Sequence, residues 1–192
     1  AADCTPLYGG ARMGETDRAT LVDYLSALHA IPVAGLAPPF DNREMRALNH
    51  EHIFRLPLSA DAPGLDRVTP GLQRTAERVR EDAAFVLATR ALGERYLSAT
   101  GPSLLHGDYF PGSWLQTPSG IRIIDPEFGF AGPPELDLGV MCAHFVLAAQ
   151  PRALTGWTAR YRGRVDARLV RQFAGVEITR RLVGVAQLPL KA

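Results

Sequence analysis

Two acidic positions of this chain are spaced as phosphoryl transfer requires. His106-Gly107-Asp108 is followed, after a short stretch, by Asp125-Pro126-Glu127. Transfer of a γ-phosphoryl group needs one carboxylate beside the acceptor hydroxyl and another on Mg²⁺, because catalysis there consists mostly of positioning and charge neutralisation. Asp108 and Asp125 fit these two positions, so their spacing favours a small-molecule kinase.

Neither motif is specific by itself. A His-Gly-Asp tripeptide is common, and an Asp-Pro pair most often marks a turn. The flanking residues strengthen both, because residues 121–124 are a β-branched strand that ends at Asp125, and residues 114–116 and the turn at 117–120 complete a hairpin. Residues 102–105 form a short apolar segment that leads into the first motif. Two acids at the same end of one hairpin can share a metal-phosphate cluster.

Three segments of the chain resemble a known family. HGDYFPGSWL, IIDPEFGFAGPPELDLG and EITRRLVGVAQL are similar to methylthioribose kinases, within the aminoglycoside phosphotransferase and choline kinase superfamily. The superfamily has a metal-binding Asn five residues after the catalytic Asp, where this chain has Ser113. Methylthioribose kinases characteristically carry Gly-Ser there and Asp-Pro-Glu-Phe later, matching residues 112–113 and 125–128. The resemblance covers about the last half of the chain.

The resemblance implies a catalytic and metal-binding set. Asp108 would be the catalytic base, Asp125 and Glu127 would hold Mg²⁺, and Ser113 would lie on the far side of the ion. Carboxylate oxygens suit a hard cation that keeps several waters and binds substrate phosphates. A neutral hydroxyl is a poorer ligand, and the alternative is that Ser113 is a turn residue after Pro111-Gly112.

Three further residues near these motifs are interpreted by the same resemblance. His106 is expected to brace the backbone through hydrogen bonds, which is more common for a lone histidine beside an apolar strand than proton transfer. Asp137 falls where the superfamily has an aspartate that opens a buried helix and braces the catalytic loop. Its alternative is a first-turn acid favoured by the helix dipole. Phe110 stands where relatives usually have His, which leaves the substrate contacts at that position open.

An arginine pair lies near the C-terminus. By resemblance, Arg180 and Arg181 belong to the segment that brings arginines to the sugar substrate, and a guanidinium can clamp hydroxyls, carboxylates or phosphates. Adjacent residues of a helix face different directions, so we expect only one of the two at the site. The alternative is a solvated pair.

Composition limits the remaining possibilities. The chain has 192 residues, 46% of them hydrophobic, which is enough for one core and one domain. A net charge of +1 without a basic run argues against nucleic acid as a partner. Of the two cysteines, Cys142 lies in an apolar run and is expected to be a buried free thiol. No signal peptide or membrane span is visible, so we expect a cytoplasmic protein.

The helical pattern predicts an α+β, mainly α fold around the hairpin. A helix capped by Thr16 should run to about residue 30, and a long helix should cover residues 72–98. Further helices are expected at residues 136–149 and 167–185.

The sequence lacks the usual parts of an ATP lobe. Residues 9–14 are glycine-rich but follow no strand, and Lys191 is the only lysine, so no strand lysine can clamp a phosphate. We therefore expect a protein-kinase-like C-terminal lobe over residues 16–192, with a linker or hinge remnant at residues 1–15 and the N-terminal ATP lobe absent. The favoured explanation is that the chain is a fragment of a longer enzyme; the alternatives are that another chain supplies the lobe or that the chain is a reduced binding module.

The sequence thus predicts an ATP- and Mg²⁺-dependent phosphotransferase acting on a hydroxyl of a small molecule. A methylthioribose-like sugar is favoured as the acceptor, with an aminoglycoside or amino alcohol second. This chain alone is expected to be inactive. The alternatives are a catalytically silent binding module that keeps the substrate cleft, and a metal-dependent hydrolase, which the small number of nearby ligands disfavours.

Overall fold

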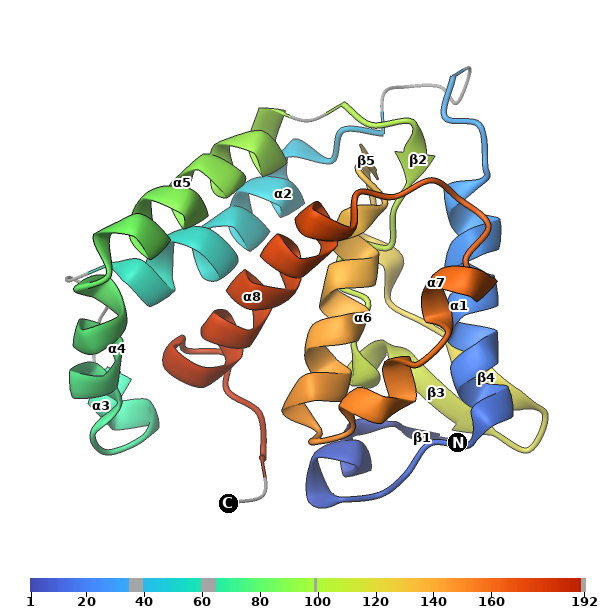
Figure 1. The fold of residues 1–192 in the computed structure, drawn as a ribbon, viewed down its shortest axis with the longest axis horizontal. Coiled ribbons are helices and arrows are strands. Elements are labelled where there is room, and N and C mark those ends of the chain that lie inside the picture. Colours follow the sequence, from blue (N-terminus) through green and yellow to red (C-terminus); the bar gives the residue numbers. More distant parts are fainter. Residues whose placement is uncertain (35–39, 60–64, 99, 191–192) are drawn as a thin grey trace.

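The computed structural model of this chain describes residues 1–34, 40–59, 65–98 and 100–190. In these residues helices dominate, and two small antiparallel sheets complete the fold (Figure 1). The predicted α+β, mainly α architecture is confirmed.

The predicted hairpin is present and carries the larger sheet. Strand β3 (Trp114–Thr117) pairs antiparallel with β4 (Gly120–Ile123), and Trp114 lies opposite Ile123. Gly120 has a φ of 98° at the turn, a conformation that glycine adopts without strain. On its other edge β3 pairs with β1 (Ala2–Asp3), so the strand order is β1-β3-β4.

A second, two-stranded sheet aligns the segments on either side of the hairpin. Strand β2 (Ser103–Leu104) pairs antiparallel with β5 (Ala131–Gly132). A Cβ on Gly101 would lie 2.0 Å from the carbonyl oxygen of Gly132, so this close approach requires glycine. The pairing brings the segment that enters the His-Gly-Asp motif beside the segment that leaves the Asp-Pro-Glu-Phe motif.

Helices surround these sheets. They are α1 (Glu15–His29), α2 (Arg43–His50), α3 (Leu65–Val68), α4 (Leu72–Arg80), α5 (Ala83–Ser98), α6 (Glu135–Leu147), α7 (Trp157–Arg160) and α8 (Ala167–Val183). Short 3₁₀ turns are η1 (Thr5–Gly9), η3 (Leu56–Leu58), η4 (Pro111–Ser113), η5 (Pro126–Phe128) and η6 (Pro151–Leu154), and η2 (Glu51–Arg55) is a π-helical turn.

Two of the expected helices differ from the structure. Helix α1 begins at Glu15 after an extended Gly14, so Thr16 lies in the first turn and is not the cap. The single helix expected over residues 72–98 is wrong, because α4 ends at Arg80 and α5 begins at Ala83. The side chain of Asp82 accepts a hydrogen bond from the backbone N–H of Phe85, and this capping contact starts a new helix.

Helix α6 is the central element. It lies between α8 on one side and α1 with α7 on the other (Figure 1), and residues 135–145 are all buried. Gly139 allows the close packing of α8, since a Cβ there would lie 2.6 Å from the Cβ of Phe173. One core cluster packs α6 against α1 and the hairpin, and the other packs it against α5 and α8. Cys142 is a buried free thiol on α6, as predicted.

Residues 1–15, for which the sequence predicts a linker, pack against the rest of the fold. The side chains of Cys4, Leu7 and Tyr8 are buried in the core cluster beneath α6. The backbone N–H of Cys4 donates to the carbonyl oxygen of Pro111, 3.0 Å away, which ties the segment to turn η4. The division into a hinge and a lobe stays a prediction.

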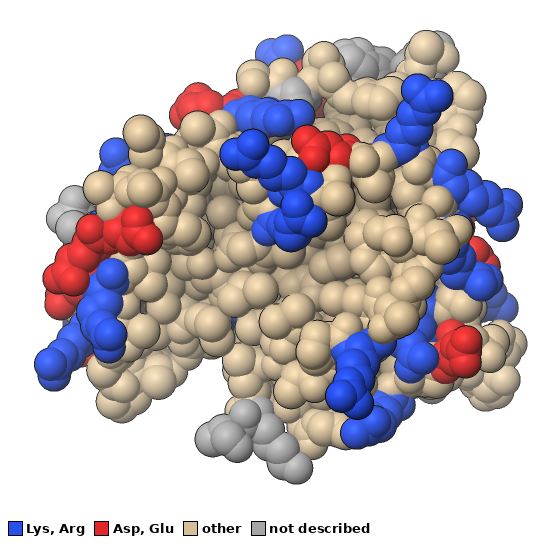
Figure 2. Space-filling view, in the orientation of Figure 1, with Lys and Arg blue, Asp and Glu red and all other residues tan. Residues whose placement is uncertain are grey.

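Charged side chains are dispersed on the face seen in Figure 2. Basic and acidic groups form small clusters around a wide uncharged area at the centre of the face. Among the described residues no helix has the length and apolar character needed to cross a membrane.

Candidate active site

Asp108 lies on the loop that connects β2 of the smaller sheet to η4, directly before β3 of the larger sheet. Gly107, which precedes it, has a φ of 84°, and a Cβ there would lie 2.1 Å from the carbonyl oxygen of Phe128. Only glycine fits this turn, so the motif needs its middle residue for a steric reason. The side chain of Asp108 is 17% exposed.

Asp137, in the first turn of α6, holds the backbone of this loop. Its fully buried carboxylate accepts hydrogen bonds from the N–H groups of His106, at 2.7 Å, and Gly107, at 2.9 Å. His29 of α1 lies 3.1 Å from the same carboxylate and 2.8 Å from the hydroxyl of Tyr161. Burial by itself would raise the pKa of Asp137, but the hydrogen bond and charge of His29 lower it overall. The ionised carboxylate therefore fixes the loop.

His106 links the same loop to the end of the hairpin. Its Nε2 lies 2.9 Å from the carbonyl oxygen of Ile124, and its Nδ1 lies 3.4 Å from the backbone nitrogen of Asp108. Because Asp108 N–H is a donor, Nδ1 must accept and Nε2–H must donate. The ring thus connects the residue before Asp125 to the residue after Gly107, and both nitrogens are used for bracing.

Asp125 and Glu127 are exposed at the end of β4. Asp125 adopts the left-handed conformation with a φ of 59° and precedes turn η5, which carries Glu127. Neither carboxylate has a hydrogen-bond or ion-pair partner among the described residues, and no group of three or more His, Cys, Asp or Glu side chains there is arranged to hold a metal ion. Two unpaired carboxylates fit Mg²⁺, which typically takes one or two carboxylates and completes its shell with waters and substrate phosphates.

Ser113 has a different place from the two acids. Its side chain is 2% exposed, and its hydroxyl donates to the carbonyl oxygen of Asp108 at 3.0 Å. The backbone N–H of Phe110 donates to the same carbonyl oxygen at 3.1 Å. Ser113 therefore stabilises the loop after Asp108, and its predicted contact with a metal stays a prediction.

Both arginines of the C-terminal pair reach Asp108. Their Nη2 atoms lie 3.8 Å (Arg180) and 3.7 Å (Arg181) from the Oδ1 of Asp108, and both side chains are buried. The expectation that only one of them faces the site is wrong. Glu177 lies three and four residues earlier on α8, and its carboxylate binds Arg180 Nη1 at 3.3 Å and Arg181 Nε at 2.7 Å. This shared partner draws two adjacent side chains to one face of the helix.

Three polar atoms of Asp108 and the two arginines retain hydrogen-bonding capacity. Oδ1 of Asp108, Nε of Arg180 and Nη2 of Arg181 are buried and have no hydrogen-bond partner. Burial raises the pKa of Asp108 above its usual value, and Arg180 opposes this shift. An acceptor hydroxyl placed between these atoms would satisfy a buried carboxylate and two guanidinium groups together.

Three residues of this region were not singled out from the sequence. Glu177 could have been found from its spacing to the arginine pair, since residues three and four apart share a helix face. His144 and Tyr8 gave no such signal. The ring of His144 lies in the apolar run of α6, 3.0 Å from Glu177 and 2.6 Å from the hydroxyl of Tyr8.

The buried His144 leads to a prediction about pH. Desolvation lowers the pKa of His144 from an ordinary 6.5 to about 4. The carboxylate of Glu177 favours the charged ring, whereas the positive charges of Arg181 and Arg180 disfavour it. The hydroxyl of Tyr8 contacts the other ring nitrogen. Because the unfolded chain binds a proton here that the folded chain excludes, stability should fall as pH falls from 6.5 toward 4. The loss should be about 2 kcal/mol between pH 7 and pH 5, since one pKa unit corresponds to about 1.4 kcal/mol.

Urea unfolding at these two pH values measures this loss, and His144→Gln should show a smaller difference than wild type. The other histidines contribute equally to both proteins, so the difference between the two losses isolates His144. Equal losses in the two proteins would contradict this assignment.

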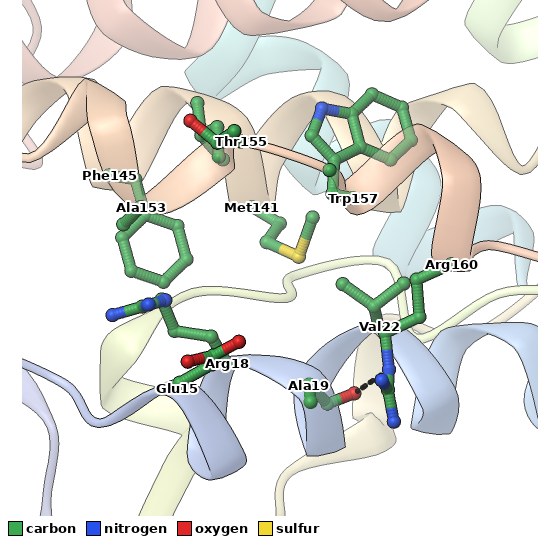
Figure 3. A pocket seen from close by; sticks show the side chains of 12 residues that line it. Glu15, Arg18, Ala19, Val22, Met141, Phe145, Ala153, Thr155, Trp157 and Arg160 are labelled. Atoms are coloured by element: carbon green, nitrogen blue, oxygen red, sulfur yellow. Dashed lines mark hydrogen bonds between the residues drawn. The ribbon is translucent and has the colours of Figure 1, made fainter.

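A separate pocket lies between α1, α6 and the η6–α7 segment (Figure 3). Its volume is about 240 Å³, and Met141, Phe145 and Trp157 form its apolar wall, with Arg18 and Arg160 at its edge. None of the predicted site residues lines it. The Asp108 region is therefore distinct from this pocket.

Comparisons with known proteins identify the family of this chain and several of its relatives. The profile of the Phosphotransferase enzyme family matches residues 14–173. Methylthioribose kinase 1 of Oryza sativa subsp. japonica is 36% identical over 115 residues, which are 59% of this chain and 26% of that protein. Methylthioribose kinase of Exiguobacterium sibiricum is 32% identical over 130 residues, 67% of this chain and 33% of that protein. That of Escherichia coli is 29% identical over 125 residues, 65% of this chain and 29% of that protein. The matches thus span about a quarter to a third of each relative.

Proposed function

This chain belongs to the phosphotransferase enzyme family, and from that premise we propose that it carries the catalytic and acceptor-binding part of an ATP-dependent small-molecule kinase. The favoured acceptor is a methylthioribose-like sugar, and an aminoglycoside or amino alcohol is the second candidate. The similarity to methylthioribose kinases supports this order of acceptors.

The observation that carries the proposal is the cluster of Asp108 with Arg180 and Arg181. A carboxylate and two guanidinium groups meet within 3.8 Å in a largely buried position. Asp108 would accept a hydrogen bond from the acceptor hydroxyl, orient it in line with the phosphoryl group and take up its proton. The forked donors of the arginines would hold neighbouring oxygens of the acceptor, which fixes its orientation.

The nucleotide side of the site would involve Asp125 and Glu127. Their exposed and unpaired carboxylates fit a magnesium ion bound together with phosphates. Mg²⁺ would neutralise the charge that develops on the phosphate oxygens during transfer. The αL conformation of Asp125 turns the chain sharply after β4, so its carboxylate follows directly from a rigid strand.

The chain spans only about a quarter to a third of the methylthioribose kinases it resembles. We propose that the remaining part of the ATP site is supplied outside these residues, by the same polypeptide or by a separate chain. Catalysis is therefore best tested in the protein that contains this chain. Acceptor binding can be tested on the chain itself.

A lysine scan of the arginine pair tests the acceptor site. Arg180→Lys and Arg181→Lys should each weaken methylthioribose binding roughly 10- to 100-fold, because Lys cannot reproduce the forked contact and a hydrogen bond to a charged group contributes about 1.5–3 kcal/mol. Calorimetry with methylthioribose, an aminoglycoside and an amino alcohol gives the affinities and ranks the acceptors.

The matched control for this scan is Arg160→Lys. Arg160 lies on α7, is half exposed and pairs with Asp23, away from Asp108. Its replacement should leave acceptor affinity unchanged. If all three variants bind every acceptor as wild type does, Arg180 and Arg181 do not contact the acceptor.

A further inference from the structure

A buried series of hydrogen bonds, formed by Tyr8, His144 and Glu177, ends at the arginine pair. The hydroxyl of Tyr8 in η1 lies 2.6 Å from Nδ1 of His144 in α6, and Nε2 of His144 lies 3.0 Å from Oε1 of Glu177 in α8. The three residues are 3%, 1% and 1% exposed. Glu177 in turn binds both arginines, so η1, α6 and α8 each contribute one residue to the series that contacts the arginine pair.

The donor and the acceptor of each hydrogen bond in the Tyr8–His144–Glu177 series can be assigned. Glu177 is ionised, because Arg180, the hydrogen bond from His144 and Arg181 lower its pKa despite a burial that would raise it. An ionised carboxylate only accepts, so Nε2–H of His144 donates to it. Nδ1 of the neutral ring must then accept from the hydroxyl of Tyr8. One tautomer of His144 is therefore selected, and it donates to the same Oε1 of Glu177 that accepts from Nε of Arg181.

Phe110 confines Arg181 from another direction. Its ring centroid lies 4.7 Å from the guanidinium carbon of Arg181 and 5.5 Å from the ring centroid of His144. Gly112 leaves room for this ring, since a Cβ there would lie 2.4 Å from Cζ of Phe110. Arg181 is thus fixed by a carboxylate and by an aromatic face, which is a favourable arrangement for a cation.

The same order of groups occurs a second time in the fold. Tyr161, His29 and Asp137 form a Tyr-His-carboxylate series that ends on the backbone of His106 and Gly107. The first series ends on the arginine side chains instead. Asp108 lies where the two series converge, since one fixes its loop and the other fixes the guanidinium groups that face its carboxylate.

We propose that Tyr8, His144 and Glu177 are positioning residues that hold the arginine pair in its acceptor-binding orientation. This inference rests on the proposed function for its link to the acceptor, while the orientation of the arginines is a property of the chain alone. Removing the hydroxyl of Tyr8 frees His144 to rotate or change tautomer, which loosens Glu177 and then Arg181. The effect should appear in acceptor binding more than in nucleotide binding.

Two variants and one control test the proposal. Tyr8→Phe should weaken methylthioribose binding roughly 3- to 10-fold, and Glu177→Gln should weaken it more than 10-fold, because the first loses one neutral hydrogen bond and the second loses the charge that binds both arginines. In the complete enzyme the change should fall on KM for the acceptor, with KM for Mg-ATP within about twofold of wild type. The control is Ser26→Ala, which removes a buried hydroxyl of α1 that belongs to neither series.

Nitrogen NMR of the chain without acceptor gives an independent measurement. Tyr8→Phe should shift the ring nitrogens of His144 and the Nε–H signal of Arg181, whereas Tyr161→Phe should shift His29 and leave Arg181 unchanged. Unchanged Arg181 signals in Tyr8→Phe, or equal losses of acceptor affinity in Tyr8→Phe and Ser26→Ala, would overturn the proposal. If wild type binds no tested acceptor but Arg181 responds to Tyr8→Phe, the positioning role stands and the proposed acceptor class fails.

Discussion

The Asp108→Asn variant of the complete enzyme is expected to lose roughly 10²- to 10⁴-fold in kcat while binding Mg-ATP as tightly as wild type. Asn keeps the size of the side chain and one acceptor oxygen, but it cannot take up the proton of an acceptor hydroxyl. Asp108 faces Arg180 and Arg181, the two residues that we propose bind the acceptor. Steady-state kinetics together with nucleotide binding by calorimetry would measure both effects.

Asp125→Asn is the contrasting variant. Asp125 is exposed and unpaired at the end of β4, where its carboxylate fits a magnesium ion held together with the nucleotide. Its replacement should weaken Mg-ATP binding itself. Full activity in Asp108→Asn, or the same kinetic defect in both variants, would remove the distinction between a base and a metal ligand.

Local patterns predicted the elements that carry the chemistry. The β-branched run before Asp125 and the turn at residues 117–120 were sufficient to predict the hairpin of β3 and β4. The apolar run after residue 136 and the periodic run after residue 167 likewise predicted α6 and α8. In each of these segments the local preference and the packing of the fold agree, which is why short-range reasoning succeeded.

Two expectations from the sequence were wrong because a single acidic side chain determines the local structure. The continuous helix expected over residues 72–98 is divided because Asp82 caps a new helix, and an acid inside a charged run gives little sign of that role. The arginine pair was expected to diverge because adjacent helix residues point apart. Long side chains can overcome that divergence when one carboxylate binds both, as Glu177 does.

Contacts between residues far apart in the sequence could not be predicted from spacing. Tyr8 and His144 are separated by 136 positions, and His29 and Asp137 by 108. Each histidine has ring atoms bound on both sides, so neither is available as a metal ligand or proton carrier without breaking its series. Helix α6 contributes His144 to one series and Asp137 to the other, and its central position therefore brings both series to the region of Asp108.

The Asp137→Asn variant should show the largest loss of stability in this region. Asp137 is fully buried and accepts from two backbone N–H groups and from His29. An amide has one acceptor oxygen, so its NH₂ group must face a buried donor, and an unpaired buried group costs about 1–3 kcal/mol. With the loss of the buried charge interaction, the free energy of unfolding should fall by about 3–5 kcal/mol. Urea unfolding monitored by circular dichroism would measure it.

Asp125→Asn is also the matched control for this stability measurement. Asn tolerates the left-handed conformation that Asp125 adopts, and the carboxylate it replaces is exposed and unpaired. Its free energy of unfolding should stay within about 0.5 kcal/mol of wild type. The same substitution therefore separates a buried acid that holds the loop from an acid that is exposed and unpaired. A small and equal loss in both variants would show that the backbone of His106 and Gly107 does not depend on Asp137.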